Sequence, residues 1–240
     1  MSSDTTTVRT DDTRGPGTVF VTGGAGGLGA AVVDAIASAG GRPAVLDLEP
    51  AKGDTPHVQV DLSDGAATES AVAELVGLAG APDAVVTAAG VDACGPLEAI
   101  GREDWERVVR VNLLGTAAVV RAALPHLLER HGTVVTVGST LGLRAVGDAT
   151  AYCASKFGVV VFTRALAIEL AGRVGVTLLI PGGMRTAFFD GRDEQYRPGP
   201  DAQLNDPADV AQAVLVALNQ PPGCELRELV VTPSREPSWP

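Results

Sequence analysis

The stretch that decides the fold is residues 18–29, Thr-Val-Phe-Val-Thr-Gly-Gly-Ala-Gly-Gly-Leu-Gly. Residues 18–21 form a short apolar run typical of a buried β-strand, and residues 28–39 have the apolar periodicity of a helix. Glycines between a strand and a helix let the backbone turn sharply, and the free N–H groups of the helix favour a phosphate. The stretch therefore predicts a strand, a phosphate-binding turn and a helix; the alternative is a merely flexible turn in a glycine-rich chain.

The rest of the chain repeats this alternation. Further strands are expected at residues 43–46, 58–60, 84–86, 133–137, 176–180 and 229–231, and further helices at 66–79, 102–130, 150–170 and 207–219. Strands that are apolar on both faces and alternate with helices indicate a parallel sheet covered on both sides. We therefore predict an α/β, doubly wound Rossmann fold with about seven parallel strands. It would form a single domain over residues 17–240, after a disordered N-terminal arm over residues 1–16.

The composition excludes several classes of protein. The formal net charge of −11 would repel nucleic acid and an anionic membrane surface, so we expect neither as a partner. No apolar run approaches the ~20 residues of a membrane span, and the polar N-terminus has no secretory signal, which predicts a cytoplasmic protein. The three cysteines, Cys94, Cys153 and Cys224, are widely spaced, so we expect small buried thiols, no disulfide framework and no metal site.

An acidic residue, Asp47, ends the second expected strand. It follows Gly29 near the offset of about 20 residues at which dinucleotide-binding folds place a carboxylate against the ribose hydroxyls. The same carboxylate would repel a 2′-phosphate, and Leu48-Glu49-Pro50 supplies no basic residue. Arg42 lies at the start of the strand and is expected to point elsewhere. The pattern predicts NAD as the cofactor; the alternative is that Asp47 is a surface acid in a loop.

Tyr152 and Lys156 lie in the helix expected over residues 150–170. Positions i and i+4 share one helix face, so the phenol and the ammonium group can converge. An adjacent cation favours the phenolate, and we expect Lys156 to lower the pKa of Tyr152 from about 10 towards working pH. Tyr152 is then a usable general acid and base. The alternative is a tyrosine packed in the core beside a lysine that extends to solvent.

Together these features resemble the short-chain dehydrogenase/reductase family, in its shorter single-domain branch, from about residue 17 to residue 231. Gly23, Gly27 and Gly29 match its TGxxxGxG turn. Residues 87–90 match its NAAG segment, with Thr87 in place of the asparagine. A threonine hydroxyl can still bond the backbone, so we expect only a modest effect on stability. Residues 181–186 match its PGxxxT segment.

The resemblance also implies roles for individual residues. Tyr152 would exchange the proton, and Ser139, at the family's usual offset before it, would orient the substrate oxygen. Lys156 would bind the nicotinamide ribose, and Asn112 would hold a water that continues the proton path. Asp61 would contact adenine. The residues expected to bind the cofactor are Gly23, Gly26, Gly27, Leu28, Gly29, Asp47, Leu48, Asp61, Leu62, Ala88, Ala89, Gly90, Tyr152, Lys156, Pro181, Gly183, Met184 and Thr186, the last holding the nicotinamide carboxamide.

The sequence says less about the substrate. Residues 184–196, expected to form a lid beside the nicotinamide, carry Phe188, Phe189 and Tyr196, which predict an apolar wall over the substrate. Charged residues are interleaved with them, Arg192 among them, and we interpret these as solvated loop charges in preference to substrate contacts. The residues expected to bind the substrate are Asp92, Cys94, Ser139, Leu141, Tyr152, Phe188 and Phe189.

The sequence therefore predicts an NAD-dependent oxidoreductase that interconverts a secondary alcohol and a ketone. A non-catalytic dinucleotide sensor on the same fold and an NADP-dependent ketoreductase are the alternatives. The sensor has no need of an acid–base group, so the presence of Asn112, Ser139, Tyr152 and Lys156 argues against it. Asp47 argues against the ketoreductase.

The long helices expected at 102–130 and 150–170 carry apolar residues on more than one stripe, and such helices need a partner besides the sheet. The resemblance implies that they pair with their copies across a two-fold axis, and often that a second interface completes a tetramer. Burial of Trp239, near the end of the chain, against another subunit would support that second interface. We therefore predict a homotetramer, with a dimer as the alternative.

Overall fold

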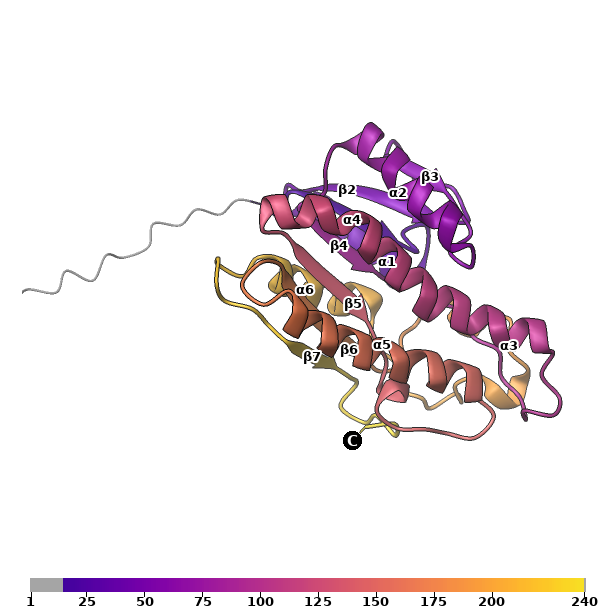
Figure 1. Ribbon diagram of the computed structural model, residues 1–240. Coiled ribbons are helices and arrows are strands. Elements are labelled where there is room, and N and C mark those ends of the chain that lie inside the picture. Colours follow the sequence, from indigo (N-terminus) through magenta and orange to yellow (C-terminus); the bar gives the residue numbers. More distant parts are fainter. Residues whose placement is uncertain (1–14, 240) are drawn as a thin grey trace, which may run out of the picture.

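The computed structural model describes residues 15–239 of the chain (Figure 1). Its centre is one sheet of seven parallel strands in the order β3-β2-β1-β4-β5-β6-β7. The strands are β1 (Thr18–Thr22), β2 (Arg42–Asp47), β3 (His57–Gln59), β4 (Ala84–Thr87), β5 (Thr133–Val137), β6 (Gly175–Pro181) and β7 (Glu228–Val231). This order, in which successive strands are added on either side of β1, is that of a doubly wound sheet and confirms the predicted fold class.

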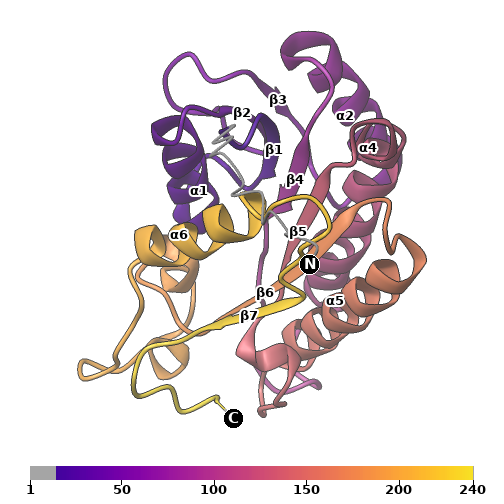
Figure 2. The same cartoon turned by 90° about the vertical axis from the view of Figure 1, so that its left-hand side faces the viewer.

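Helices cover both faces of the sheet (Figure 2). On one face lie α1 (Gly27–Ser38) and α6 (Pro207–Leu218), and on the other lie α2 (Gly65–Ala79), α4 (Thr116–Arg130) and α5 (Thr150–Glu169). Successive strand residues point to opposite faces, so Val19 and Val21 pack under α1 and α6 while Phe20 packs with the other three helices. Both faces of the sheet are thereby closed by Val, Leu, Ile and Ala side chains.

One long helical rod departs from the sequence prediction. We expected a continuous helix over residues 102–130, and Figure 1 shows α3 (Arg102–Val109) and α4 in line. Between them, Arg110–Gly115 forms a π-helical turn. Such turns are rare and frequently lie at functional sites. Here the turn carries Asn112, whose side-chain bonds to other segments are described below.

Two helical stretches, Arg102–Arg130 and Thr150–Glu169, have the length and hydropathy of a membrane span. The expectation that no apolar run approaches this length is therefore wrong. In each stretch about half of the apolar window is buried inside the protein, 50% and 44%. Helices that cover a sheet have this composition because one of their faces belongs to the core.

The predicted N-terminal arm, residues 1–16, lies almost wholly outside the described residues, which begin at Gly15. Pro16, assigned to that arm, is already buried. Its ring lies close to Gly41, just after α1. The packed chain therefore includes at least one residue of the segment that we expected to be disordered.

Candidate active site

The main cavity among the described residues, about 620 Å³, opens at the carboxyl ends of the parallel strands. In doubly wound sheets this edge is where ligands bind. All the residues expected to bind the cofactor line this cavity except Gly29, and Ser139, Leu141, Phe188 and Phe189 line it too. Asn112, Asp92 and Cys94 do not line it. The structure thus brings most of the predicted site together from segments that are far apart in the sequence.

The glycine turn between β1 and α1 forms one end of this cavity. Gly23 has φ +71°, and a Cβ atom there would lie 2.7 Å from the Cα atom of Ala89. Gly29 does not reach the cavity, but a Cβ atom on it would collide with the carbonyl oxygen of Gly23. At Gly26, by contrast, a Cβ atom would meet nothing within 4 Å. The turn is therefore close-packed beneath and open towards the cavity, which is the cradle that a phosphate requires.

Asp47 lies at the end of β2, beside this turn. Its carboxylate accepts hydrogen bonds from the backbone N–H groups of Ala25, at 2.9 Å, and Glu49, at 3.1 Å. Arg42 points away as expected, because its guanidinium donates to Thr18 Oγ1 at 2.7 Å, at the opposite end of the strands. The carboxylate is therefore held in place at the cavity without an arginine beside it.

Asp61 lines the cavity close to Asp47 and pairs with Arg107, with an N–O distance of 2.9 Å. Burial opposes ionisation, but the backbone N–H of Ser63 and the guanidinium of Arg107 hold the pKa of Asp61 below its ordinary value. The acidic groups that line this end of the cavity are Asp47, Glu49 and Asp61, and Arg107 is the cation among its described lining residues.

Tyr152 and Lys156 lie on the first turns of α5, with the Lys156 Nζ atom 5.7 Å from the centre of the Tyr152 ring. Lys156 is buried, and its ammonium group donates to the carbonyl oxygen of Val137 at 2.9 Å. Burial lowers the pKa of Lys156 to about 8 and raises the pKa of Tyr152 to about 12, a rise that the Ser139 hydroxyl opposes. The predicted lowering of the tyrosine pKa by Lys156 is therefore wrong for the protein alone, because burial of the phenol is the largest influence on its pKa.

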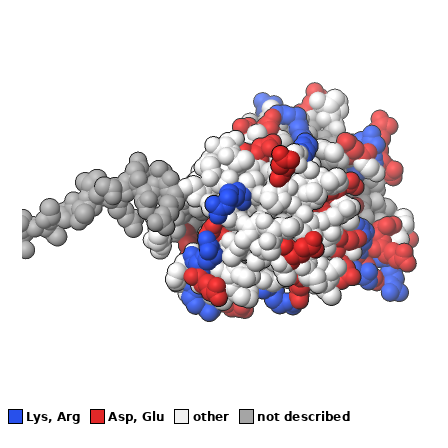
Figure 3. Space-filling model, turned by 90° about the horizontal axis from the view of Figure 1, so that it is seen from above, with Lys and Arg blue, Asp and Glu red and all other residues white. Residues whose placement is uncertain are grey.

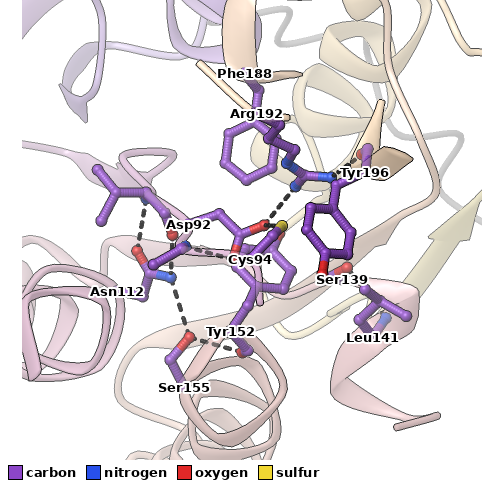
Figure 4. Close-up of polar contacts among 12 residues, drawn as sticks. Asp92, Cys94, Asn112, Ser139, Leu141, Tyr152, Ser155, Phe188, Arg192 and Tyr196 are labelled. Carbon is purple, nitrogen blue, oxygen red and sulfur yellow. Dashed lines mark hydrogen bonds and ion pairs between the residues drawn. The ribbon is translucent and has the colours of Figure 1, made fainter. Parts of the chain in front are cut away.

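Ser139 follows β5 and is buried beside Tyr152, where its hydroxyl accepts from the N–H of Leu141 at 3.1 Å. Asn112 is buried, and Figure 4 shows its hydrogen bonds to neighbouring segments. Its amide exchanges hydrogen bonds with both backbone groups of Val91, at 2.8 and 2.9 Å, and donates to Ser155 Oγ at 3.0 Å. Asn112 therefore connects the loop after β4 to helix α5, which carries Tyr152.

Thr87 behaves differently from our expectation. It is buried at the end of β4, but its hydroxyl has no hydrogen-bond partner among the described residues. The predicted bond from this hydroxyl to the backbone is therefore absent.

The segment after β6 covers Tyr152 from above. The Phe188 ring lies 5.7 Å from the Tyr152 ring, and the Phe189 ring lies 5.5 Å from that of Phe188. Phe188 and Phe189 thus form the predicted apolar wall. Tyr196 donates to a carboxylate oxygen of Asp148 at 3.0 Å, which ties the segment to the loop before α5.

Arg192 was interpreted as a solvated loop charge, and this is wrong. Only 18% of its side chain is exposed, and its guanidinium pairs with Asp92, which is 6% exposed, at 2.5 Å (Figure 4). The guanidinium also lies 5.0 and 4.6 Å from the ring centres of Phe188 and Phe189. A planar cation stacks well on aromatic faces, so the two rings and the carboxylate together hold it inside the protein.

Asp92 and Cys94, both expected to bind substrate, line a second cavity of about 720 Å³ on the far side of this ion pair. The Cys94 thiol donates to Asp92 Oδ2 at 3.2 Å, and burial together with that carboxylate raises its pKa to about 12. All three cysteines are free, but only Cys153 is buried, while Cys224 is exposed. No group of potential metal ligands is found among the described residues.

Sequence reasoning missed the C-terminal tail. Glu236 and Ser238 line the main cavity, Ser238 Oγ lies 2.6 Å from Thr140 Oγ1, and the Pro237 carbonyl accepts from Arg144 at 2.9 Å. The tail is therefore held by its own subunit, and Trp239 is 39% exposed in this single chain. No sequence signal marks these contacts, because the paired hydroxyls are separated by 98 positions.

The outer surface of α5 exposes apolar side chains, among them Val161 at 63% and Ile168 at 79%. This agrees with the argument that the helix needs a second partner, and the predicted tetramer stays a prediction. On the face shown in Figure 3, acidic and basic groups of the described residues are interspersed around a broad uncharged surface.

Comparison with known proteins identifies the class to which this fold and cavity belong. Residues 17–197 match the family model described as short chain dehydrogenase. The chain belongs to the short-chain dehydrogenase/reductase family, as its motifs predicted. It is accordingly an oxidoreductase that acts on CH–OH groups of a small molecule with a nicotinamide dinucleotide.

Two of the relatives are dehydrogenases by name. The chain is 31% identical to 2,5-dichloro-2,5-cyclohexadiene-1,4-diol dehydrogenase of Sphingobium indicum, over 82% of this chain and 86% of that protein. It is 29% identical to L-fucose dehydrogenase of Mus musculus, over 91% and 88%. The alcohol dehydrogenase of Thermococcus sibiricus, solved with 5-hydroxy-NADP, has the same fold, with a TM-score of 0.79, 22% identity and coverage of 89% and 95%.

Proposed function

We propose that this protein is an NAD-dependent oxidoreductase that interconverts a secondary alcohol and a ketone, with Tyr152 as the general acid and base. One observation carries the proposal: Ser139, Tyr152 and Lys156 line the same cavity as the glycine turn and Asp47. A dinucleotide sensor would need the glycine turn and Asp47, but it would not need Ser139, Tyr152 and Lys156.

The residues fit a dinucleotide that extends along this cavity. The open cradle at Gly26 and Gly27 suits the pyrophosphate, and Asp47 suits the hydroxyls of the adenine-side ribose. Lys156 suits the nicotinamide ribose, with Thr186 and the Pro181–Gly183 turn around the ring. A bound nicotinamide supplies or accepts the hydride and carries a positive charge in its oxidised form.

The chain's own residues handle the proton and the substrate. Tyr152 takes the alcohol proton during oxidation and returns it during reduction, while Ser139 donates a hydrogen bond to the substrate oxygen. Phe188 packs against the ring of Tyr152, with 5.7 Å between the two ring centres. Lys156 donates to the Val137 carbonyl, and the Asn112 amide bonds Val91 and Ser155. These hydrogen bonds hold α5 in place against the loops around it.

The preference for NAD over NADP rests on charge. The acids Asp47, Glu49 and Asp61 line the adenosine end, and Arg107, the cation there, is already paired. A 2′-phosphate would add negative charge beside them, at a cost in affinity. The Thermococcus sibiricus protein of the same fold was solved with an NADP analogue, so the proposal of NAD rests on the charges of this chain and not on its fold.

The test is a panel of secondary alcohols and ketones offered with NAD and NADP in parallel, followed by the near-ultraviolet absorbance of the reduced nicotinamide. We expect turnover that depends on NAD and is lost when Tyr152 is replaced. Binding of the dinucleotide without turnover on any member of the panel would favour the sensor. We further propose that the protein is a homotetramer, which light scattering of the purified chain would test. We also propose that it is cytoplasmic and has no nucleic-acid or membrane partner.

A further inference from the structure

The C-terminal tail, residues 232–239, brings a carboxylate into the main cavity. Both Glu236 and Ser238 line the cavity that contains Tyr152. The match to the family model ends at residue 197, so the tail belongs to a part of the chain that this match does not cover. Neither side chain has a role in the proposed function above.

Three hydrogen bonds fix Glu236 in place. Its Oε2 atom accepts from the backbone N–H of Gly183 at 3.1 Å. Its Oε1 atom accepts from the backbone N–H and the hydroxyl of Ser238, at 3.0 and 2.6 Å. The Ser238 hydroxyl also contacts Thr140, next to Ser139. The carboxylate is therefore held between the turn after β6 and the turn after β5, and both turns line the cavity that Tyr152 also lines.

The turn after β6 is shaped around this carboxylate. A Cβ atom on Gly182 would collide with Glu236 Oε2, so any side chain at position 182 would displace it. This turn, Pro181–Gly183, is the one that we assign to the nicotinamide ring. The carboxylate thus lies against the turn that we assign to the nicotinamide ring. The charge of this ring differs between the oxidised and the reduced cofactor.

The charge of Glu236 is not balanced by an ion pair with any of the described residues. The cations that face this end of the cavity are committed elsewhere. Lys156 donates to the Val137 carbonyl, and burial lowers its pKa to about 8. Arg192 is paired with Asp92. The negative charge of Glu236 is therefore available to a cationic ligand.

We propose that Glu236 is a specificity-determining residue for the oxidation state of the cofactor, favouring the oxidised nicotinamide, which is cationic, over the reduced one, which is neutral. The inference rests on the proposed function, because it requires a nicotinamide at this turn. A carboxylate interacts with the additional positive charge only in the oxidised form. Solvent at the open side of the cavity screens this attraction, so the expected preference is about tenfold. The cavity is accordingly biased towards alcohol oxidation.

The test compares the binding of NAD⁺ and NADH, each measured by titration calorimetry, with no substrate present. Glu236→Gln removes the charge but keeps the size of the side chain and an oxygen that accepts from Gly183. We expect the ratio of the NADH Kd to the NAD⁺ Kd to fall about tenfold, through weaker NAD⁺ binding and with NADH binding almost unchanged. Gly182→Ala, which displaces the carboxylate by steric collision, should lower the ratio in the same direction.

Glu225→Gln is the matched control. Its carboxylate also accepts from a backbone N–H, that of Val176, at 3.3 Å, but at the opposite end of β6 from the cavity. This variant changes the net charge equally and should leave the ratio unchanged. A shift of less than twofold in Glu236→Gln, or an equal shift in Glu225→Gln, overturns the inference while leaving the proposed function intact. Failure of the unmodified protein to bind either form overturns both.

Discussion

The two ends of the main cavity are built in different ways. At the cofactor end, the β1–α1 turn and Asp47 are neighbours in the fold through short local connections, and backbone N–H groups hold the Asp47 carboxylate. At the substrate end, the contacts join side chains from distant segments, as in the pairs Asp92–Arg192 and Thr140–Ser238. Backbone geometry therefore shapes the cofactor end, and side-chain pairing shapes the substrate end. Substitutions at the two ends should accordingly affect different properties of the protein.

The largest effect is expected where the two ends meet. Tyr152→Phe removes the proposed proton donor and keeps the ring that packs against Phe188, so turnover should fall at least ~100-fold with cofactor binding preserved. Alcohol oxidation by the unmodified protein should accelerate as pH rises, because its phenolate is the base. Steady-state rates and dinucleotide titrations measure both. Tyr196→Phe is the control, since that hydroxyl bonds Asp148; near-normal turnover in Tyr152→Phe would refute the role of the phenol.

At the substrate end, Arg192→Met leaves the Asp92 carboxylate buried without its cation. We expect a loss of about 2 kcal/mol in the free energy of unfolding, somewhat below the usual figure for a buried pair because Arg192 is partly exposed. Urea denaturation measures this loss, and Asp92→Asn in the same chain should recover part of it. Arg197→Met, which removes bonds only to the backbone carbonyls of Arg192 and Asp190, should cost much less. Equal losses in the two single variants would show that the ion pair is not decisive.

At the cofactor end, Asp47→Ala removes the carboxylate that we expect to reject a 2′-phosphate. The preference for NAD over NADP, measured as the ratio of the two kcat/KM values, should shrink by about tenfold. A basic residue at Leu48 in the same chain should shift the ratio further towards NADP. Equal kcat/KM with both cofactors in the unmodified protein would contradict the charge argument.

The last expected effect concerns stability as a function of pH. Burial lowers the pKa of Lys156 from 10.5 to about 8 in the folded state. Between these two values the unfolded chain binds more protons than the folded one, so stability should rise with pH across this window. The contribution is at most about 1.4 kcal/mol per pH unit. Lys156→Met should remove it, which urea denaturation at pH values from 8 to 10 will show; identical slopes in the two proteins would exclude it.

Local patterns predicted the glycine turn and Asp47 well because these residues are close in the sequence. A strand, a glycine turn and a helix occur in one run of residues, and the offset to Asp47 follows from the length of a helix and a strand. The spacing of Tyr152 and Lys156 similarly follows from one helical turn. The structure places all these residues in one cavity, and their chemical roles stay predictions.

The substrate end could not be predicted in this way. Arg192 is surrounded by charged residues in the sequence, a pattern typical of a solvated loop, and its ion-pair partner lies 100 positions away. Glu236 reaches the cavity through a backbone N–H 53 positions earlier. Thr87 was expected to find a backbone partner, and no local feature of the sequence shows that it lacks one. Burial and pairing at these positions depend on tertiary contacts alone.

The π-helical turn Arg110–Gly115 determines how the chain responds to the deletion of one residue. Its i→i+5 hydrogen bonds accommodate one residue more than an α-helical turn does, so α3 and α4 keep their faces despite the extra residue. Deleting one residue within it would leave an unbroken α-helix, while the side chains of the turn itself would point in new directions. Asn112 would then leave Val91 and Ser155, although no cavity-lining residue had been replaced.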